Sequence, residues 1–164
     1  MTSIPEPILL LAPIVAGDEI AGGSMGLLLF YITLALSLSF ICSVLEAVLL
    51  SSSASYIEGL VQQGSRSGVL MQRHKLNVER PISAILTLNT VAHTVGATLA
   101  GAEAAAIFGS AFVGLISAVL TILVLVLSEI LPKTIGAVYW RQLVPFSAYM
   151  IQLFTVLLLP AVWL

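Results

Sequence analysis

An acid, a proline and a lysine stand close together in residues 128–133, Ser-Glu-Ile-Leu-Pro-Lys, at the end of a long uncharged apolar run. A run of about 20 apolar residues crosses a bilayer, and an ionised Glu129 at that depth needs a partner, water, a proton or a cation. Pro132 has no N–H, so the carbonyl of Ser128 loses its helical donor. Free oxygens beside a helix break predict a cation site. The alternative is a helix end at the membrane interface, with Lys133 reaching toward the headgroups.

Two other apolar stretches carry polar residues at helical spacing. Ser39, Ser43 and Glu46 follow an i, i+4, i+7 pattern, so they share one helix face. Asn89 and His93 are four residues apart and share a face of a second helix. The alternative interpretation is structural: the serines bond back to their own helix, Glu46 lies at the inner interface, and the amide and imidazole hold helices together.

One hydroxyl, one amide and one carboxylate come from three different predicted spans, at Ser43, Asn89 and Glu129. Such hard oxygen ligands suit Mg²⁺ or Ca²⁺, and the chain has no Cys–His pair at helical spacing for a softer metal. The sequence lacks HExxH, GxSxG and a glycine-rich phosphate loop, so we expect no enzyme. It also lacks polybasic runs, which argues against a nucleic-acid partner.

The composition is that of a membrane protein: 59% of the 164 residues are hydrophobic and 9% are charged. We therefore predict an all-α integral protein of the lipid bilayer, with three transmembrane helices and short cytoplasmic or juxtamembrane helices. Pro145 and Pro160 interrupt the last apolar stretch, which favours a C-terminal re-entrant or interfacial helical hairpin over a fourth span. The predicted order is an external segment at 1–23 and a membrane domain at 24–164, with spans at about 25–50, 82–108 and 111–138, a cytoplasmic segment at 53–80 and the hairpin at 143–164.

Charges are distributed unevenly along the chain. All six Lys and Arg residues follow the first span, whereas residues 1–23 carry acids and no base. By the positive-inside rule, the N-terminus lies outside and the 53–80 segment is cytoplasmic, in a multi-pass protein of the cell (plasma) membrane. His74, between Arg73 and Lys75, is expected to be a solvated surface residue.

Three short stretches resemble the motifs of one family. Residues 43–51, Ser-Val-Leu-Glu-Ala-Val-Leu-Leu-Ser, look like S-x-S-E-T-A-L-L-S, and residues 85–91, Ile-Leu-Thr-Leu-Asn-Thr-Val, look like I-L-x-G-N-x-L. Residues 129–134, Glu-Ile-Leu-Pro-Lys-Thr, match E-I-x-P-K-T closely and are the most specific of the three. Over most of residues 25–164 the chain thus resembles the DUF21 transmembrane domain of the CNNM/CorC magnesium transporters.

The resemblance implies a homodimer, in which each protomer has three spans and a short helical hairpin at the inner face. It implies one dehydrated Mg²⁺ held by the Ser43 hydroxyl, the Asn89 amide oxygen and the Glu129 carboxylate, with backbone carbonyls completing the shell. Transport in the family is thought to be Mg²⁺ efflux coupled to Na⁺ entry, so Na⁺ is the expected coupling ion. The cytoplasmic CBS-pair domain expected in the family is absent from these 164 residues.

The sequence departs from the family pattern at four positions. Leu45 replaces a serine and Leu88 replaces a glycine. His93 stands where a second asparagine is usual, and Ser128 stands where glycine is usual. His93, Ser128 and Glu46 are therefore candidate neighbours of the metal, and His93 could ligate it when neutral, donate to a ligand or add pH dependence. Two other functions stay open: a non-transporting Mg²⁺-sensing membrane scaffold or regulator, and a carrier for another cation such as Na⁺ or H⁺.

Overall fold

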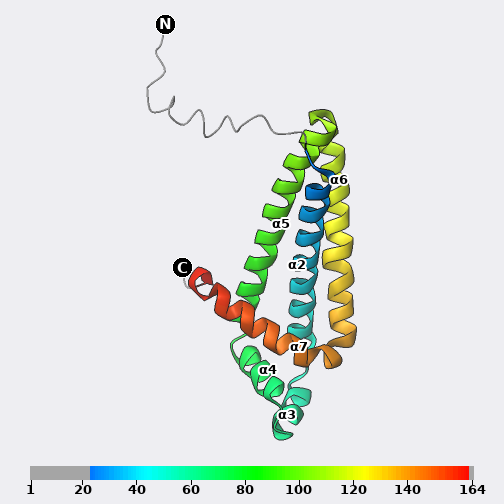
Figure 1. Cartoon of the computed structure of the whole chain (residues 1–164). Coiled ribbons are helices and arrows are strands. Elements are labelled where there is room, and N and C mark those ends of the chain that lie inside the picture. Colours follow the sequence, from blue (N-terminus) through cyan, green and yellow to red (C-terminus); the bar gives the residue numbers. More distant parts are fainter. Residues whose placement is uncertain (1–22, 163–164) are drawn as a thin grey trace, which may run out of the picture.

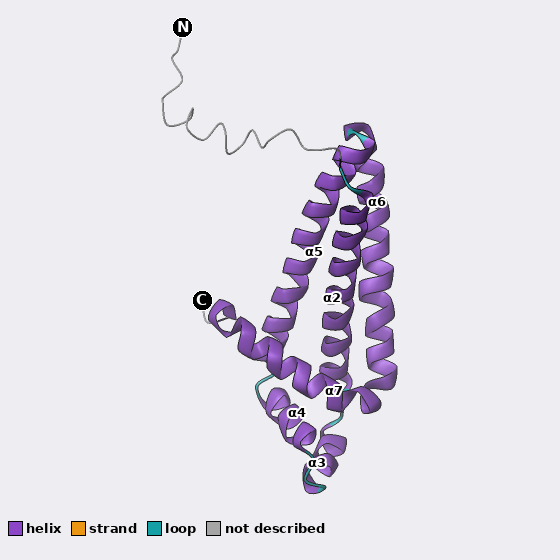
Figure 2. Ribbon diagram, in the orientation of Figure 1, coloured by secondary structure: helices purple, strands orange, loops and turns teal. Residues whose placement is uncertain are grey.

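The computed structural model describes the backbone of residues 23–162 and the side chains of residues 23–158. Nearly all of the expected external segment, residues 1–23, therefore lies outside the described residues. Within them every regular element is helical, as Figure 2 shows, and the predicted all-α class is confirmed. In chain order the elements are α2 (Met25–Ser51), α3 (Ala54–Gln62), α4 (Arg66–Leu76), α5 (Glu79–Phe108), the short η1 (Ser110–Phe112), α6 (Val113–Leu123), the π-helical turn η2 (Val124–Ile130) and α7 (Leu131–Val162).

Three helical stretches are long and apolar enough to cross a membrane: Met25–Ser51, Glu79–Phe108 and Ser110–Leu158. Figure 1 shows α2, α5 and α6 running side by side as a bundle, with α3 and α4 together at one end. The first two stretches begin and end within about three residues of the predicted spans, because the apolar runs that define a span are uninterrupted there. The third continues past the predicted end at 138, since α7 stays helical.

Small residues bring the helices of the bundle close together. A side chain at Gly96 of α5 would collide with Ala35 of α2, so the two backbones approach closely there. Gly136 of α7 plays the same part against α2, where a Cβ atom would lie 2.7 Å from the Cβ of Ala47. Close backbone approach at glycine is how membrane helices gain contact without an apolar driving force between them.

At one end of the bundle, α2 and α5 are joined by a hydrogen bond. The backbone N–H of Ser24, just before α2, donates to Glu103 Oε2 of α5 at 2.9 Å. Ser24 itself caps α2, since its hydroxyl accepts from the N–H of Leu27. The carboxylate therefore lies where the partial positive charge of a helix start favours it.

The third span bends sharply before its last part. Tyr139 has non-helical dihedral angles (φ −100°, ψ 16°), and the arm that follows runs across the end of the bundle beside α4 (Figure 1). We expected a hairpin at 143–164, but the described part of this segment is a single helical arm. Pro145 does not break it, and the Arg141 carbonyl that lacks its N–H accepts a hydrogen bond from the Tyr56 hydroxyl at 3.3 Å.

A helical hairpin does form at this end, but it consists of α3 and α4. Gly64 supplies the positive φ of the turn between them (φ 75°). His74 of α4 was expected at the surface, yet it is 5% exposed, because α7 packs on α4. Burial lowers the pKa of His74, Arg73 lowers it further, and a hydrogen bond with the Ala148 backbone partly opposes both.

Candidate metal centre

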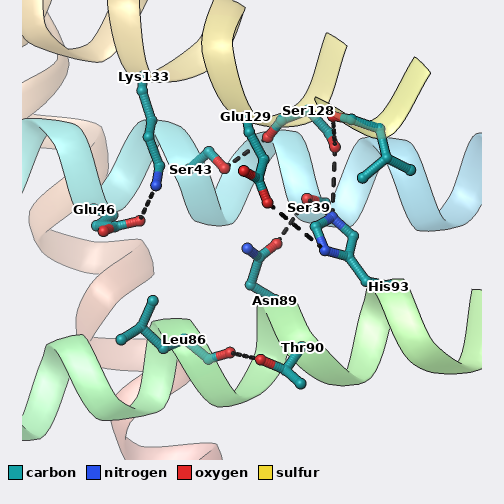
Figure 3. Close-up of polar contacts among 11 residues, drawn as sticks. Ser39, Ser43, Glu46, Leu86, Asn89, Thr90, His93, Ser128, Glu129 and Lys133 are labelled. Carbon is teal, nitrogen blue, oxygen red and sulfur yellow. Dashed lines mark hydrogen bonds and ion pairs between the residues drawn. The ribbon is translucent and has the colours of Figure 1, made fainter. Parts of the chain in front are cut away.

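Polar side chains from three elements meet in the middle of the bundle, where α2 contacts both α5 and η2. Figure 3 shows Ser39 and Ser43 from α2, Asn89 and His93 from α5, and the turn that carries Glu129 around one small region. The three predicted ligands and His93 are therefore brought together. This convergence follows from the i, i+4 spacing on α2 and α5, which places each pair on a single helix face.

Ser39 connects the two polar residues of α5. Its hydroxyl is buried and donates to Asn89 Oδ1 at 2.7 Å, and it lies 2.5 Å from His93 Nε2. A hydroxyl has one proton, so the proton between Ser39 and His93 belongs to Nε2. In the neutral ring, Nδ1 of His93 is then an acceptor.

That acceptor faces a carboxylate. His93 Nδ1 lies 3.9 Å from Glu129 Oε1, and the two side chains are 24% and 36% exposed. Two acceptors at this separation repel each other unless a proton or a cation lies between them. Either would relieve the repulsion between the imidazole and the carboxylate.

Ser43 contacts the backbone beside Glu129. Its buried hydroxyl donates to the carbonyl of Ser128 at 2.6 Å. This is the carbonyl that Pro132 was predicted to deprive of its helical donor, and here a hydroxyl from α2 takes that place. The oxygens of Ser43 and Ser128 therefore lie together at the centre of the bundle.

The π-helical turn η2 carries Ser128 and Glu129. In this turn the N–H of Leu131 donates to the carbonyl of Val126, five residues earlier. The wider turn adds one residue to the helix, which is a common feature of functional sites in helices. The Ser128 hydroxyl bonds to the Val124 carbonyl at 2.7 Å and lies 3.5 Å from His93 Nε2, so Ser128 also belongs to the cluster.

Glu46, by contrast, is not part of this cluster. Its Oε2 lies 3.2 Å from the Nζ of Lys133, and the pair is displaced along α2 from the other polar residues (Figure 3). The lysine thus compensates the second intramembrane acid locally. The charge of the cluster is left to Glu129.

Ser39 is the residue that the sequence did not assign to the site. The signal was present, since Ser39 is one turn before Ser43 on the same stripe, but the serine could equally have bonded to its own helix. Among the residues that the structure describes, no three residues of the types His, Cys, Asp and Glu gather at one point. The donors here are instead hydroxyl, amide, carbonyl and carboxylate oxygens with one imidazole, a set that suits hard cations.

A sequence profile of the cyclin M transmembrane N-terminal domain (CNNM) matches residues 30–164. The chain belongs to this family. The chain is 36% identical over 128 residues to the UPF0053 protein sll1254 of Synechocystis sp., which is 77% of this chain and 36% of that protein. It is 31% identical over 105 residues to the UPF0053 inner membrane protein YfjD of Escherichia coli, 64% of this chain and 24% of that protein. The chain thus spans about a third or less of the length of these relatives.

Membership of the cyclin M transmembrane family confirms the resemblance seen in the sequence, and with the three candidate spans it makes the chain a multi-pass membrane protein. The departures from the family motifs divide into two groups. Leu45 and Leu88 belong to the apolar core around α2. His93 and Ser128 lie in the polar cluster, so these two are the departures that can change its chemistry.

Proposed function

We propose that this cyclin M domain binds Mg²⁺ between α2, α5 and η2 and carries it across the membrane. The proposed ligands are the hydroxyl of Ser43, the amide oxygen of Asn89 and the carboxylate of Glu129. Backbone carbonyls, with that of Ser128 as the nearest candidate, complete the shell. The observation that carries the proposal is the convergence of these oxygens from three separate helical elements on one region.

The donor set fits a hard divalent ion. Mg²⁺ gives up its water reluctantly and prefers octahedral oxygen geometry, so a dehydrating site needs oxygens at fixed positions on rigid elements. The buried hydroxyls of Ser39 and Ser43 are fixed by hydrogen bonds to the neighbouring elements. A single carboxylate leaves the charge of the ion partly uncompensated, because Glu46 is paired with Lys133. Incomplete compensation favours release, which a carrier requires.

The step that exposes the ion to the other side is proposed to be a tilt of the third span near Pro132. Pro132 lies about one turn after Glu129 and removes one backbone hydrogen bond, so a tilt there would move the carboxylate relative to Asn89 on α5. Discontinuous helices serve this purpose in other carriers. Efflux direction, Na⁺ as the coupling ion, the homodimer and the plasma membrane as location are predictions from the family resemblance.

A flux assay tests the proposal. Purified chain in liposomes that contain a Mg²⁺-sensitive dye is given external Mg²⁺, with and without an outward or inward Na⁺ gradient. We expect Mg²⁺ entry with the parent chain and near-background entry with Glu129→Gln, which keeps the shape of the side chain but removes the charge. Glu58→Gln is the matched control, because Glu58 lies exposed on α3, away from the cluster.

Two results would overturn transport by this site. Glu129→Gln that carries Mg²⁺ as fast as Glu58→Gln would exclude the carboxylate as a ligand. Mg²⁺ binding in calorimetry without any flux by the parent chain would favour the Mg²⁺-sensing scaffold or regulator.

A carrier for another cation is the second candidate, and the contact between His93 and Glu129 favours it. A proton between Nδ1 and Oε1 would satisfy both groups without any metal. Competition among Mg²⁺, Ca²⁺, Mn²⁺ and Na⁺ in the flux assay separates the candidates. His93→Asn restores the residue usual in the family, and we expect it to preserve Mg²⁺ flux; if it instead abolishes a pH-driven Na⁺ or H⁺ flux, the second candidate is correct.

A further inference from the structure

A second polar site lies at the end of the bundle that carries α3 and α4. A pocket of about 220 Å³ opens between α4, the start of α5 and the arm of α7. Its polar lining residues are Arg73, His74, Asn77, Arg80, Gln152 and Thr155. Among the described residues that line it, none is Asp or Glu. The pocket thus presents two guanidinium groups, two amides, a hydroxyl and an imidazole, which together favour an anion.

His74, on the wall of this pocket, has a buried ring nitrogen without a hydrogen-bond partner among the described residues. The side chain is 5% exposed, and the nitrogen is Nε2. Buried polar atoms are nearly always hydrogen-bonded, because a group that has left water without a new partner is unfavourable. Because Nε2 is itself fully buried, an oxygen-bearing ligand in the pocket supplies that partner only when the ring turns toward it.

The chemistry of the lining points to phosphate. Arginine presents a planar fork of N–H groups that binds phosphate oxygens in pairs, and amide and hydroxyl groups add further donors. Arg73 comes from the last turns of α4 and Arg80 from the first turn of α5, so the short link between these helices brings the two charges to one pocket.

The position of the pocket decides which phosphate is favoured. Arg80 and Pro81 stand where the apolar span of α5 begins, which is the depth of the lipid headgroups. On the neighbouring arm of α7, Leu153, Val156 and Leu157 expose 56%, 54% and 65% of their surface. An acyl chain can lie against these residues while its headgroup enters the pocket.

We propose that this pocket binds a phosphate group, and that its source is the headgroup of an anionic phospholipid. The inference is independent of the metal centre and of transport. It differs from the general attraction of basic residues to an anionic membrane surface, which needs no pocket and no particular arginine.

Native mass spectrometry of the full chain in detergent, in the absence of Mg²⁺, tests the proposal. The chain is titrated with phosphatidic acid or phosphatidylglycerol, and with zwitterionic phosphatidylcholine as reference. We expect one anionic lipid to bind more tightly than phosphatidylcholine, and Arg73→Gln and Arg80→Gln each to weaken it about tenfold, as the loss of a charge-assisted hydrogen bond does. Arg66→Gln is the matched control, since Arg66 starts α4 and does not line the pocket.

Two further variants keep the test decisive. His74→Phe keeps an aromatic ring but removes both nitrogens, and we expect the affinity for the anionic lipid to fall about threefold. If Arg80→Gln fails to fold by its thermal unfolding midpoint, Arg73→Gln and Thr155→Val test the same prediction. Equal anionic-lipid affinity in Arg66→Gln and Arg73→Gln would overturn the pocket and leave only surface attraction.

Inorganic phosphate distinguishes the two sources of the group. With a lipid as ligand, millimolar phosphate leaves the lipid adduct in place and gives no shift in phosphorus NMR with lipid-free chain. A phosphate shift that is present in the parent chain and lost in Arg73→Gln would support the phosphate site and assign it to a soluble ion. No binding of either ligand by the parent chain would overturn the proposal.

Discussion

Two prolines in the third span, Pro132 and Pro145, meet the same local problem in different surroundings. Neither can donate to the carbonyl one turn earlier. At Pro132 that carbonyl belongs to Ser128, and the hydroxyl of Ser43 reaches it from α2 at 2.6 Å in the buried centre of the bundle. Here a side chain of the neighbouring helix satisfies the carbonyl that the proline leaves without a donor.

At Pro145 the freed carbonyl belongs to Arg141 and accepts the hydroxyl of Tyr56 at 3.3 Å, in an exposed position. Water or headgroups can replace the tyrosine there, so the bond is weaker and optional. The comparison shows that a proline by itself makes no site. A proline contributes to a site where the carbonyl it leaves free is buried, because another side chain must then donate to that carbonyl.

The largest expected effect comes from the helix contact at Gly136, which lies between the two prolines in sequence. A Cβ atom at this position would lie 2.9 Å from the carbonyl oxygen of Val44, which belongs to backbone and cannot turn away. We expect Gly136→Ala to lower the free energy of unfolding by about 1–3 kcal/mol, as overpacking does. Thermal unfolding in detergent measures it. Gly101→Ala is the control, because a Cβ atom there meets nothing within 4 Å; an equal loss in both variants would contradict the close contact.

The buried hydrogen bond from Ser43 to the Ser128 carbonyl is next. Ser43→Ala leaves the Ser128 carbonyl without the hydroxyl, and we expect a loss of about 1–3 kcal/mol in Mg²⁺-free unfolding. Pro132→Ala supplies a backbone N–H to the same carbonyl, so Ser43→Ala should cost less in that background. Ser37→Ala, at an exposed position on α2, is the control. Additive effects of the two changes would mean that the hydroxyl and the proline act independently.

The ion pair of Glu46 and Lys133 is more exposed than the hydrogen bond at Ser128 and less exposed than the one at Arg141. The side chains are 17% and 46% exposed, so solvent screens much of their attraction. We expect a coupling of about 0.2–1 kcal/mol in the double-mutant cycle of Glu46→Gln and Lys133→Gln, and a smaller one in high salt. A coupling that does not change with salt would indicate that the pair is more deeply buried than its exposure implies.

The smallest effect is expected at the exposed hydrogen bond beside Pro145. Tyr56→Phe removes the hydroxyl but keeps the ring, which packs edge-on against Trp140 at a centroid distance of 5.1 Å. The loss should be about 0.5 kcal/mol, the lower end for a hydrogen bond. Thermal unfolding of Tyr56→Phe and Ser43→Ala compares the two hydrogen bonds directly. A larger loss of unfolding free energy in Tyr56→Phe would contradict the conclusion that the buried bond is the stronger one.

Much of this arrangement could be predicted from the sequence, for physical reasons. A run of apolar residues has few alternatives to a membrane helix, so the predicted bounds of the first two spans agree with the structure within about three residues. The freed carbonyl of Ser128 was predicted because it follows from the missing N–H of Pro132 alone. The convergence of Ser43, Asn89 and Glu129 came from the family resemblance, and their role as ligands is still a prediction.

What could not be predicted depends on contacts between distant segments. The burial of His74 requires α7 to lie on α4, and the polar neighbours of His74 in sequence give no sign of that. The contribution of Ser39 depends on the rotation of α2 against α5. The π-helical turn η2 depends on small differences among backbone hydrogen-bond patterns, which side-chain periodicity does not report.

The hydrogen bond between Ser24 and Glu103 has a mechanical consequence. It fastens α2 to α5 at the far end from α3 and α4, where Gly23 also fits closely against Ala106 and Ile107. These contacts hold the ends of α2 and α5 together on the side of the bundle away from α3 and α4. A tilt of the third span near Pro132 would therefore leave the first two spans joined at this end.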